Sequence, residues 1–161
     1  MKITLLTVGK VREPGFAQAI AEYKKRLSAY CALELIEVAD EKTPDSASPA
    51  EEDLIRRKEA ERLLKYVTKA PTSYVICLEI QGRQFSSEQF AACLERQAVA
   101  GKSHFFFIIG GSLGLHPSVT RMADLHLSFS EMTFPHQLMR VILLEQIYRS
   151  FKIRRHEPYH K

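Results

Sequence analysis

The chain has 161 residues and a mass of 18.4 kDa, with 45% hydrophobic and 26% charged residues, as in an ordinary globular domain. It has no apolar run of membrane-spanning length, no signal peptide and no C-x-x-C pair among its three cysteines, so we expect a reduced, cytoplasmic protein without a metal site or membrane anchor. The formal charge of +4 and the pI near 9.0 favour anionic partners.

The first half of the chain predicts two strands that alternate with two helices. Apolar residues recur at helical spacings after Pro14. The stretch Ser48-Pro49-Ala50-Glu51 combines an N-cap, a proline at the first helical position and a glutamate that closes a capping box. The helix that follows is highly charged, so we expect it to be peripheral. In order, the elements are a strand over 2–8, a helix over 14–30, a strand over 33–38 and a helix from 49 to about 67.

The second half predicts three strands and three helices. Residues 105–109 are all apolar, which suits a strand that is buried on both faces. This run ends in Gly110-Gly111-Ser112-Leu113-Gly114, where glycines allow a sharp turn and a close approach of the backbone to a ligand. In order, the elements are a strand over 74–80, a helix over about 88–100 capped by Ser86 or Ser87, a strand over 105–109, a short helix from 117, a strand over 125–129 and a helix over about 135–151.

This alternation predicts a single-domain α/β fold over residues 1–161, with a mainly parallel sheet of five or six strands and helices on both faces. Ligands of open α/β sheets bind outside the carboxyl ends of the strands. We therefore expect the functional site at the 110–114 turn and at the 128–137 stretch, which follows the last strand. The last helix is apolar around nearly its whole circumference, which predicts that a second subunit covers part of it.

Motifs of other nucleotide-binding folds are missing from the sequence. It contains no G-x-x-x-x-G-K-[ST] stretch, and its glycine cluster lies in the C-terminal half, not after the first strand as in a dinucleotide fingerprint. His156 and His160 are four residues apart, but Pro158 breaks the helix that would align them on a metal. The residues alone leave two alternatives open, a flavodoxin-like nucleotide-binding module and a basic ribosome-associated factor without catalysis.

Several motifs carry a resemblance to one known family. They are Lys2-Ile3-Thr4, Val8-Gly9-Lys10, Leu78-Glu79-Ile80-Gln81-Gly82, the stretch from Leu127 to Gln137, Arg140-Val141, Glu145-Gln146-Ile147-Tyr148-Arg149 and the terminal Pro158-Tyr159-His160-Lys161. Over essentially its whole length the chain resembles the SPOUT-class methyltransferases of the RlmH family, which N3-methylate a pseudouridine in bacterial 23S ribosomal RNA. The local difference is Arg154-Arg155-His156-Glu157, a segment that varies in the family.

The resemblance implies a C-terminal trefoil knot, a rare exception to the rule that chains do not thread loops, with the knot and the cofactor site over about residues 74–155. S-adenosylmethionine is the cofactor that it implies. The family's cofactor contacts correspond to Leu78, Gly110, Phe129, Ser130, Glu131, Met132, Thr133 and Phe134. The resemblance also implies a homodimer that acts on 23S ribosomal RNA within the ribosome, without a metal.

The acceptor sets a further chemical requirement. An imide nitrogen carries a proton, so methylation at N3 needs a base, or a cation that stabilises the anion. We predict that His136 and Arg140, near the start of the last helix, and Tyr159 and His160, in the tail, serve this step. Residues 149–161 also interleave cations with aromatic side chains, a composition that suits an RNA-facing segment. Which residue removes the proton is left open by the sequence.

Overall fold

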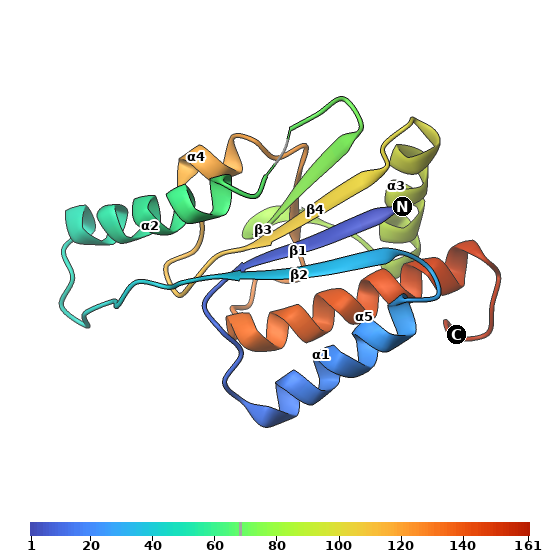
Figure 1. Ribbon diagram of the computed structural model, residues 1–161, viewed down its shortest axis with the longest axis horizontal. Coiled ribbons are helices and arrows are strands. Elements are labelled where there is room, and N and C mark those ends of the chain that lie inside the picture. Colours follow the sequence, from blue (N-terminus) through green and yellow to red (C-terminus); the bar gives the residue numbers. More distant parts are fainter. Residues whose placement is uncertain (68) are drawn as a thin grey trace.

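The computed structural model of the protein describes residues 1–67 and 69–161. A five-stranded sheet forms its centre, and every pair of neighbouring strands in it is parallel (Figure 1). The spatial order is β2-β1-β4-β3-β5. The strands are β1 (Lys2–Val8), β2 (Ala32–Val38), β3 (Ser73–Gln84), β4 (His104–Ile109) and β5 (Leu125–Ser128). The predicted parallel α/β fold is therefore confirmed.

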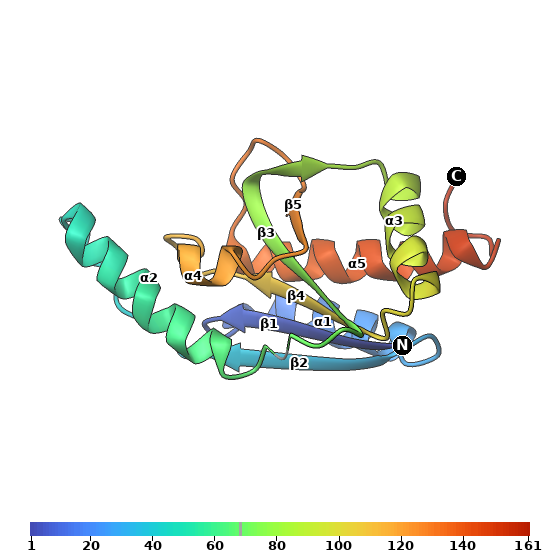
Figure 2. The same cartoon turned by 90° about the horizontal axis from the view of Figure 1, so that it is seen from above.

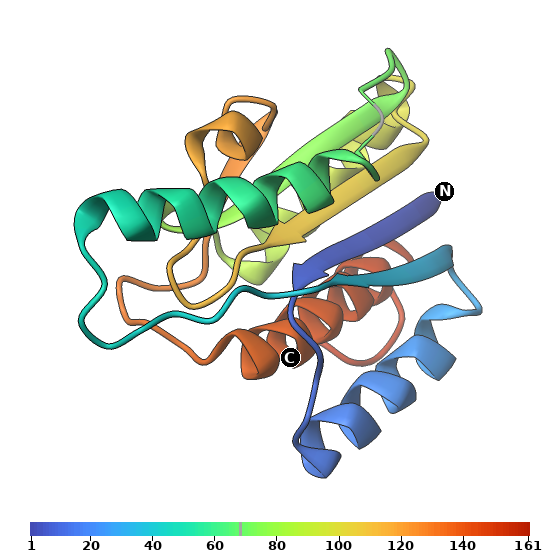
Figure 3. The same cartoon turned by 60° about the vertical axis from the view of Figure 1, so that its left-hand side comes forward.

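Helices cover both faces of this sheet (Figure 2, Figure 3). They are α1 (Pro14–Leu27), α2 (Pro49–Leu64), α3 (Ser87–Val99), α4 (Pro117–Thr120) and α5 (His136–Arg154). The side chains of β4 alternate between two cores, as expected for a strand that is buried on both faces. Phe105, Phe107 and Ile109 pack toward α1, α3 and α5, whereas Phe106 and Ile108 pack toward α2 and α4.

The caps of α2 and α3 form as the sequence predicts. Ser48 Oγ accepts a hydrogen bond from the Glu51 N–H at 3.2 Å, and the Glu51 carboxylate accepts one from the Ser48 N–H at 2.6 Å. The same reciprocal arrangement joins Ser86 and Gln89 at the start of α3. Each box satisfies two backbone donors that a helix start otherwise leaves unpaired.

Helix α2 is only partly peripheral. Its first turns project beyond the carboxyl ends of β1 and β2 (Figure 2). Ala60 and Leu63, however, pack into the core on this side of the sheet, and Glu59 is also buried. The charged middle of the helix therefore contributes a buried carboxylate to the interior, which its amphipathic pattern does not indicate.

Strand β3 extends four residues beyond the predicted end at Ile80, because it bends around β5. Leu127 of β5 is paired with Leu78 before the bend and with Arg83 after it. The Ser128 hydroxyl donates a hydrogen bond to the Ile80 carbonyl at 2.8 Å. A Cβ on Gly82 would lie 2.8 Å from backbone atoms of the strand that this bend surrounds. The end of β5 thus lies inside the bend of β3, in contact with its backbone.

Helix α5 packs against both α1 and α3 (Figure 1). Leu143, Leu144 and Ile147 on its inner side are fully buried. Its outer side carries a half-buried apolar stripe, which consists of Leu138, Val141 and Ile142. The intrachain core therefore accounts for only part of the apolar surface of α5. None of the described helices is both long enough and apolar enough to cross a membrane.

Candidate functional site

A cavity of about 810 Å³ opens at the carboxyl ends of β3, β4 and β5. This volume lies within the usual range for small-molecule sites. Three segments contribute most of its lining: the end of the first part of β3, the glycine turn after β4, and the chain between β5 and α5. The lining residues are 78–81, 109–115, 132–136, Leu127, Phe129, Ser130 and Met139.

The structure brings most of the predicted cofactor-binding residues together in this cavity. Leu78, Gly110, Phe129, Ser130, Met132, Thr133 and Phe134 all line it. Glu131 is exposed and does not belong to the lining. The Met132 side chain is 74% exposed, so it stands at the mouth of the cavity and is not a core residue.

Glycines shape the turn that forms the floor of the cavity. A Cβ on Gly110 would lie 2.6 Å from the carbonyl carbon of Gly114, closer than real Cβ atoms approach backbone. Gly114 itself has a φ of 79°, in the left-handed region that favours glycine. On the far side of the turn, the position of a Cβ on Gly111 would be 3.1 Å from Glu59 Oε2. Close backbone packing within the turn therefore requires a glycine at position 110, and the positive φ favours one at position 114.

His136, the first residue of α5, also lines the cavity. The start of this helix is attached to the loop after β1, because Gln137 Oε1 accepts hydrogen bonds from the Arg12 and Glu13 backbone N–H groups at 2.8 and 3.2 Å. Burial, reinforced by the positive charge of Arg140, lowers the pKa of His136 below its ordinary value. The imidazole is therefore neutral near pH 7 and can accept a proton.

Arg140, which is predicted to act together with His136, is close enough to lower the pKa of His136 but lies beneath the cavity. It is 2% exposed, and it is not part of the cavity lining. Its guanidinium donates to Glu37 Oε1 at 2.6 Å and to the carbonyls of Val8 and Gly9 at 2.8 and 2.9 Å. These contacts join α5 to the ends of β1 and β2. Arg140 therefore stabilises the packing of α5 against β1 and β2.

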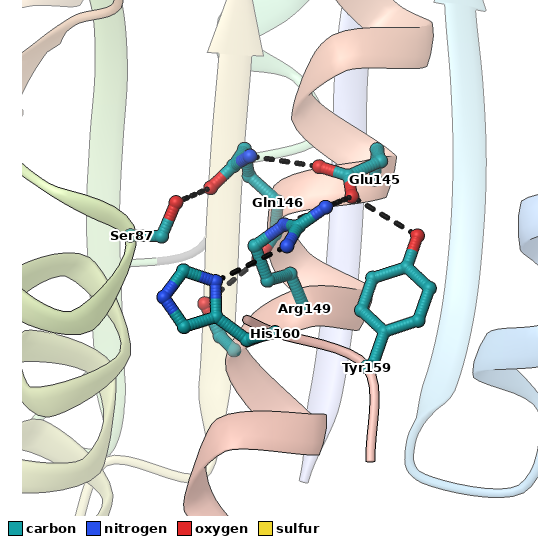
Figure 4. A network of polar contacts seen from close by, with 7 residues as sticks. Ser87, Glu145, Gln146, Arg149, Tyr159 and His160 are labelled. Carbon is teal, nitrogen blue, oxygen red and sulfur yellow. Dashed lines mark hydrogen bonds and ion pairs between the residues drawn. The ribbon is translucent and has the colours of Figure 1, made fainter.

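The tail residues Tyr159 and His160 lie beside Glu145 and Arg149, in the middle and C-terminal half of α5 (Figure 4). The Tyr159 hydroxyl donates to Glu145 Oε1 at 3.1 Å, and Arg149 Nη1 donates to His160 Nδ1 at 3.1 Å. His160 Nε2 is 2.6 Å from Glu88 Oε1 of α3. Neither tail residue lines the cavity of its own chain. Burial also raises the pKa of Tyr159, which makes its hydroxyl a donor and a poor base.

The cavity has an uneven charge distribution. Among the described residues, its lining contains no lysine or arginine and one carboxylate, Glu79. The Glu79 carboxylate contacts His126 Nδ1 of β5. A second carboxylate, Glu59, is buried behind the glycine turn. Within the described part of the chain, no three His, Cys, Asp or Glu side chains are grouped as a metal site would require.

Some residues at the site were missed in the sequence. Glu79 and Gln81 lie just after Leu78, and their place at the end of the predicted strand over 74–80 was the signal that could have identified them. Leu113 lies within the predicted 110–114 turn, whereas Leu115 directly follows that turn and could have been found from its place there. Glu59 is different, because nothing in its charged helix marks one glutamate as buried against a loop more than fifty residues away.

Comparisons with known proteins match this chain to one family over nearly its whole length. The family described as "Predicted SPOUT methyltransferase" matches residues 1–160. The ribosomal RNA large subunit methyltransferase H of Bifidobacterium adolescentis is 58% identical, and that of Exiguobacterium sibiricum is 54% identical. The corresponding protein of Clostridium kluyveri is 51% identical. Each of these alignments covers 100% of both chains.

A solved structure is more distantly similar. It is a methyltransferase from Legionella pneumophila in complex with bound S-adenosylmethionine, with a TM-score of 0.48 and 12% identity. The alignment covers 94% of this chain and 66% of that one. At this level of similarity, the ligand contacts of that structure cannot be assigned to residues of this chain.

Proposed function

Because this chain belongs to the SPOUT methyltransferase family, we propose that it transfers a methyl group from S-adenosylmethionine to N3 of a pseudouridine in bacterial 23S ribosomal RNA. The observation that carries this proposal is the full-length identity of 51–58% to proteins named ribosomal RNA large subunit methyltransferase H. We propose N3 as the methylated atom and pseudouridine as the target base because the sequence carries the motifs of the RlmH family.

The cavity fits S-adenosylmethionine, which supplies a methyl group on a sulfonium when it is bound. Backbone groups at the ends of β3 and β4 are available to hydrogen-bond an adenine edge. Phe129, Met132 and Phe134 can cover the apolar parts of the ligand. The lining presents no cation that would repel the sulfonium. We assign cofactor contacts to the seven predicted residues of the lining, and we keep Glu131 as a proposed backbone contact of the same segment.

We assign the removal of the N3 proton to His136. This side chain lines the cavity, and its lowered pKa leaves it neutral near pH 7. An acceptor bound beside His136 would be held next to the cofactor, which favours the in-line alignment that methyl transfer needs. Arg140 supports the step by fixing the first turn of α5 and by holding the pKa of His136 low.

The knot is proposed over about residues 74–155 of a single catalytic domain, 1–161. Two features support it. The end of β5 lies inside the bend of β3, at Leu127. The chain then runs from β5, at one edge of the sheet, to the start of α5 beside the loop after β1, on the other side of β3 and β4. A segment that enters such a bend and leaves toward the opposite side has the path that a trefoil requires.

We further propose a cytoplasmic homodimer that acts on the assembled ribosome. The half-buried stripe of Leu138, Val141 and Ile142 on α5 supports a subunit contact. The tail, with Tyr159 and His160, lies outside the cavity of its own chain and carries the cations and aromatic rings that suit RNA. We propose that the assembled surface of this domain and its tail recognises the RNA.

Methylation of purified ribosomes tests the proposal. Ribosomes from cells that lack this modification are incubated with the protein and methyl-labelled S-adenosylmethionine, and the labelled nucleotide is identified by mass spectrometry. We expect 3-methylpseudouridine in 23S ribosomal RNA. Label on another base, or no label despite cofactor binding, would contradict the assigned substrate. Free 23S ribosomal RNA, tested beside whole ribosomes, distinguishes the two forms of substrate.

A further inference from the structure

The charge around the cavity can distinguish the cofactor from the product that the cofactor leaves after methyl transfer. S-adenosylmethionine carries a sulfonium cation, which S-adenosylhomocysteine lacks after methyl transfer. The two molecules are otherwise nearly the same in shape. Apolar contacts and backbone hydrogen bonds therefore bind both similarly, and a fixed charge near the sulfur is the simplest way to separate them.

Among the described residues, two carboxylates lie at the cavity, and its lining has no lysine or arginine; the one histidine there, His136, is neutral near pH 7. Glu79 is part of the lining, at the carboxyl end of the first part of β3. Its carboxylate is held by His126 of β5, the group that faces it across the two strands. Glu59 lies on the other side, where its Oε2 atom is 3.1 Å from the Cβ position of Gly111 in the glycine turn.

Glu59 is a buried carboxylate of unusual placement. It is 4% exposed, and its Oε1 atom accepts a hydrogen bond from the Glu41 backbone N–H at 3.0 Å. Burial raises its pKa, an effect that the charge of Asp40 increases and that of Arg62 opposes. A cation bound in the cavity would favour its ionised form. Because Glu59 is buried, its charge is only weakly screened by solvent.

We propose that Glu79 and Glu59 make the cavity selective for charge, so that the cationic cofactor binds more tightly than the uncharged thioether product. Glu79 makes the larger contribution, because it lies in the lining, whereas Glu59 acts through the backbone of the glycine turn. The consequence is that methyl transfer itself weakens the attraction between the site and its ligand, which promotes product release. This inference rests on the proposed binding of S-adenosylmethionine in the cavity.

Calorimetry with three ligands tests the inference. Dissociation constants are measured for S-adenosylmethionine, S-adenosylhomocysteine and sinefungin, a cationic amine analogue, at about pH 8, where an ordinary histidine is neutral. The quantity of interest is the ratio of the product constant to the cofactor constant. We expect Glu79→Gln to lower this ratio by about threefold to tenfold and Glu59→Gln to lower it less. Sinefungin should follow the cofactor.

Glu61→Gln is the matched control, because Glu61 is an exposed acid on the same helix as Glu59. It should leave the ratio unchanged. A purely structural role for Glu79 would weaken the binding of both ligands equally, and an unchanged ratio in Glu79→Gln would overturn the inference. If that variant does not fold, an equal affinity of the parent protein for sinefungin and for S-adenosylhomocysteine would overturn it instead. A parent protein that binds none of the three ligands contradicts the proposed function itself.

Discussion

Gly82 lies where the bend of β3 meets β5, and its lack of a side chain allows the two backbones to touch. A Cβ there would be 2.8 Å from backbone atoms of both His126 and Leu127. We expect Gly82→Ala to lower the free energy of unfolding by about 1–3 kcal/mol, because neither strand can move without losing its pairing. Urea denaturation measures this change.

Gly15 provides the control for this substitution. It lies in the first turn of α1, and a Cβ there has no neighbour within 4 Å. Gly15→Ala should leave the stability unchanged or raise it by about 0.5–1 kcal/mol, since alanine loses less backbone entropy on folding. Equal unfolding midpoints for the two variants would show that the backbone contact at Gly82 is unimportant.

His136 should determine how the reaction depends on pH. As a base it works only when neutral, and the neutral fraction increases as the pH rises through its pKa. Burial lowers that pKa, so the rate of methyl transfer should be flat near pH 7 and fall only in more acidic solution. In His136→Gln we expect a large loss of kcat together with the loss of this acidic limb. A variant that keeps the parental pH profile would exclude His136 as the base.

At the scale of the element, α5 is held at its first turns by Arg140. Substituting this buried side chain leaves the Glu37 carboxylate and the Val8 and Gly9 carbonyls without their donor. We expect Arg140→Met to lower the free energy of unfolding by about 2–4 kcal/mol, measured by chemical denaturation. Arg26→Met on α1 removes an exposed pair with Glu22 and should change the midpoint little. Similar losses of stability in the two variants would show that the contacts of Arg140 do not hold α5 in place.

At the scale of the whole molecule, the outer stripe of α5 should join two subunits. Ile142 is half-buried within one chain, so Ile142→Glu would place a charge in the proposed interface, where it has no partner. We expect monomers or insoluble protein, measured by light scattering at micromolar concentration. Glu61→Gln, a change on the far face of the sheet, should remain dimeric. A monomeric parent protein would rule out the interface.

The tail permits a separation of cofactor binding from catalysis. Residues 158–161 follow the end of α5 and do not contribute to the cavity of their own chain. Their removal should leave the affinity for S-adenosylmethionine nearly unchanged while abolishing methylation of ribosomes. Calorimetry and label incorporation measure the two effects. Tyr159→Phe, which keeps the ring on Arg149 but loses the hydroxyl bond to Glu145, should retain more activity than the truncation. A truncated protein with full activity would make the tail dispensable.

The sequence by itself determined the elements of this molecule and much of its cavity. The capping boxes at Ser48 and Ser86 and the helix that starts at Pro14 depend on residues within one turn of each other. Local signals of this kind do not need the rest of the chain. The glycine turn at Gly110 could be identified as a site because a parallel sheet brings its carboxyl ends to one edge, whatever the order of the strands.

Only the tertiary structure decided which distant groups meet. Arg140 was expected near the reaction, but its donors contact carbonyls more than 130 residues earlier in the chain. Tyr159 and His160 are also predicted to serve the reaction, and within this chain they contact Glu145 of α5 and Glu88 of α3. The sequence predicts that Glu59 is one of several charges on a solvated helix, whereas the structure places it beside Gly111. The partner of a long polar side chain depends on how separate elements pack, and no periodicity within one element records that packing.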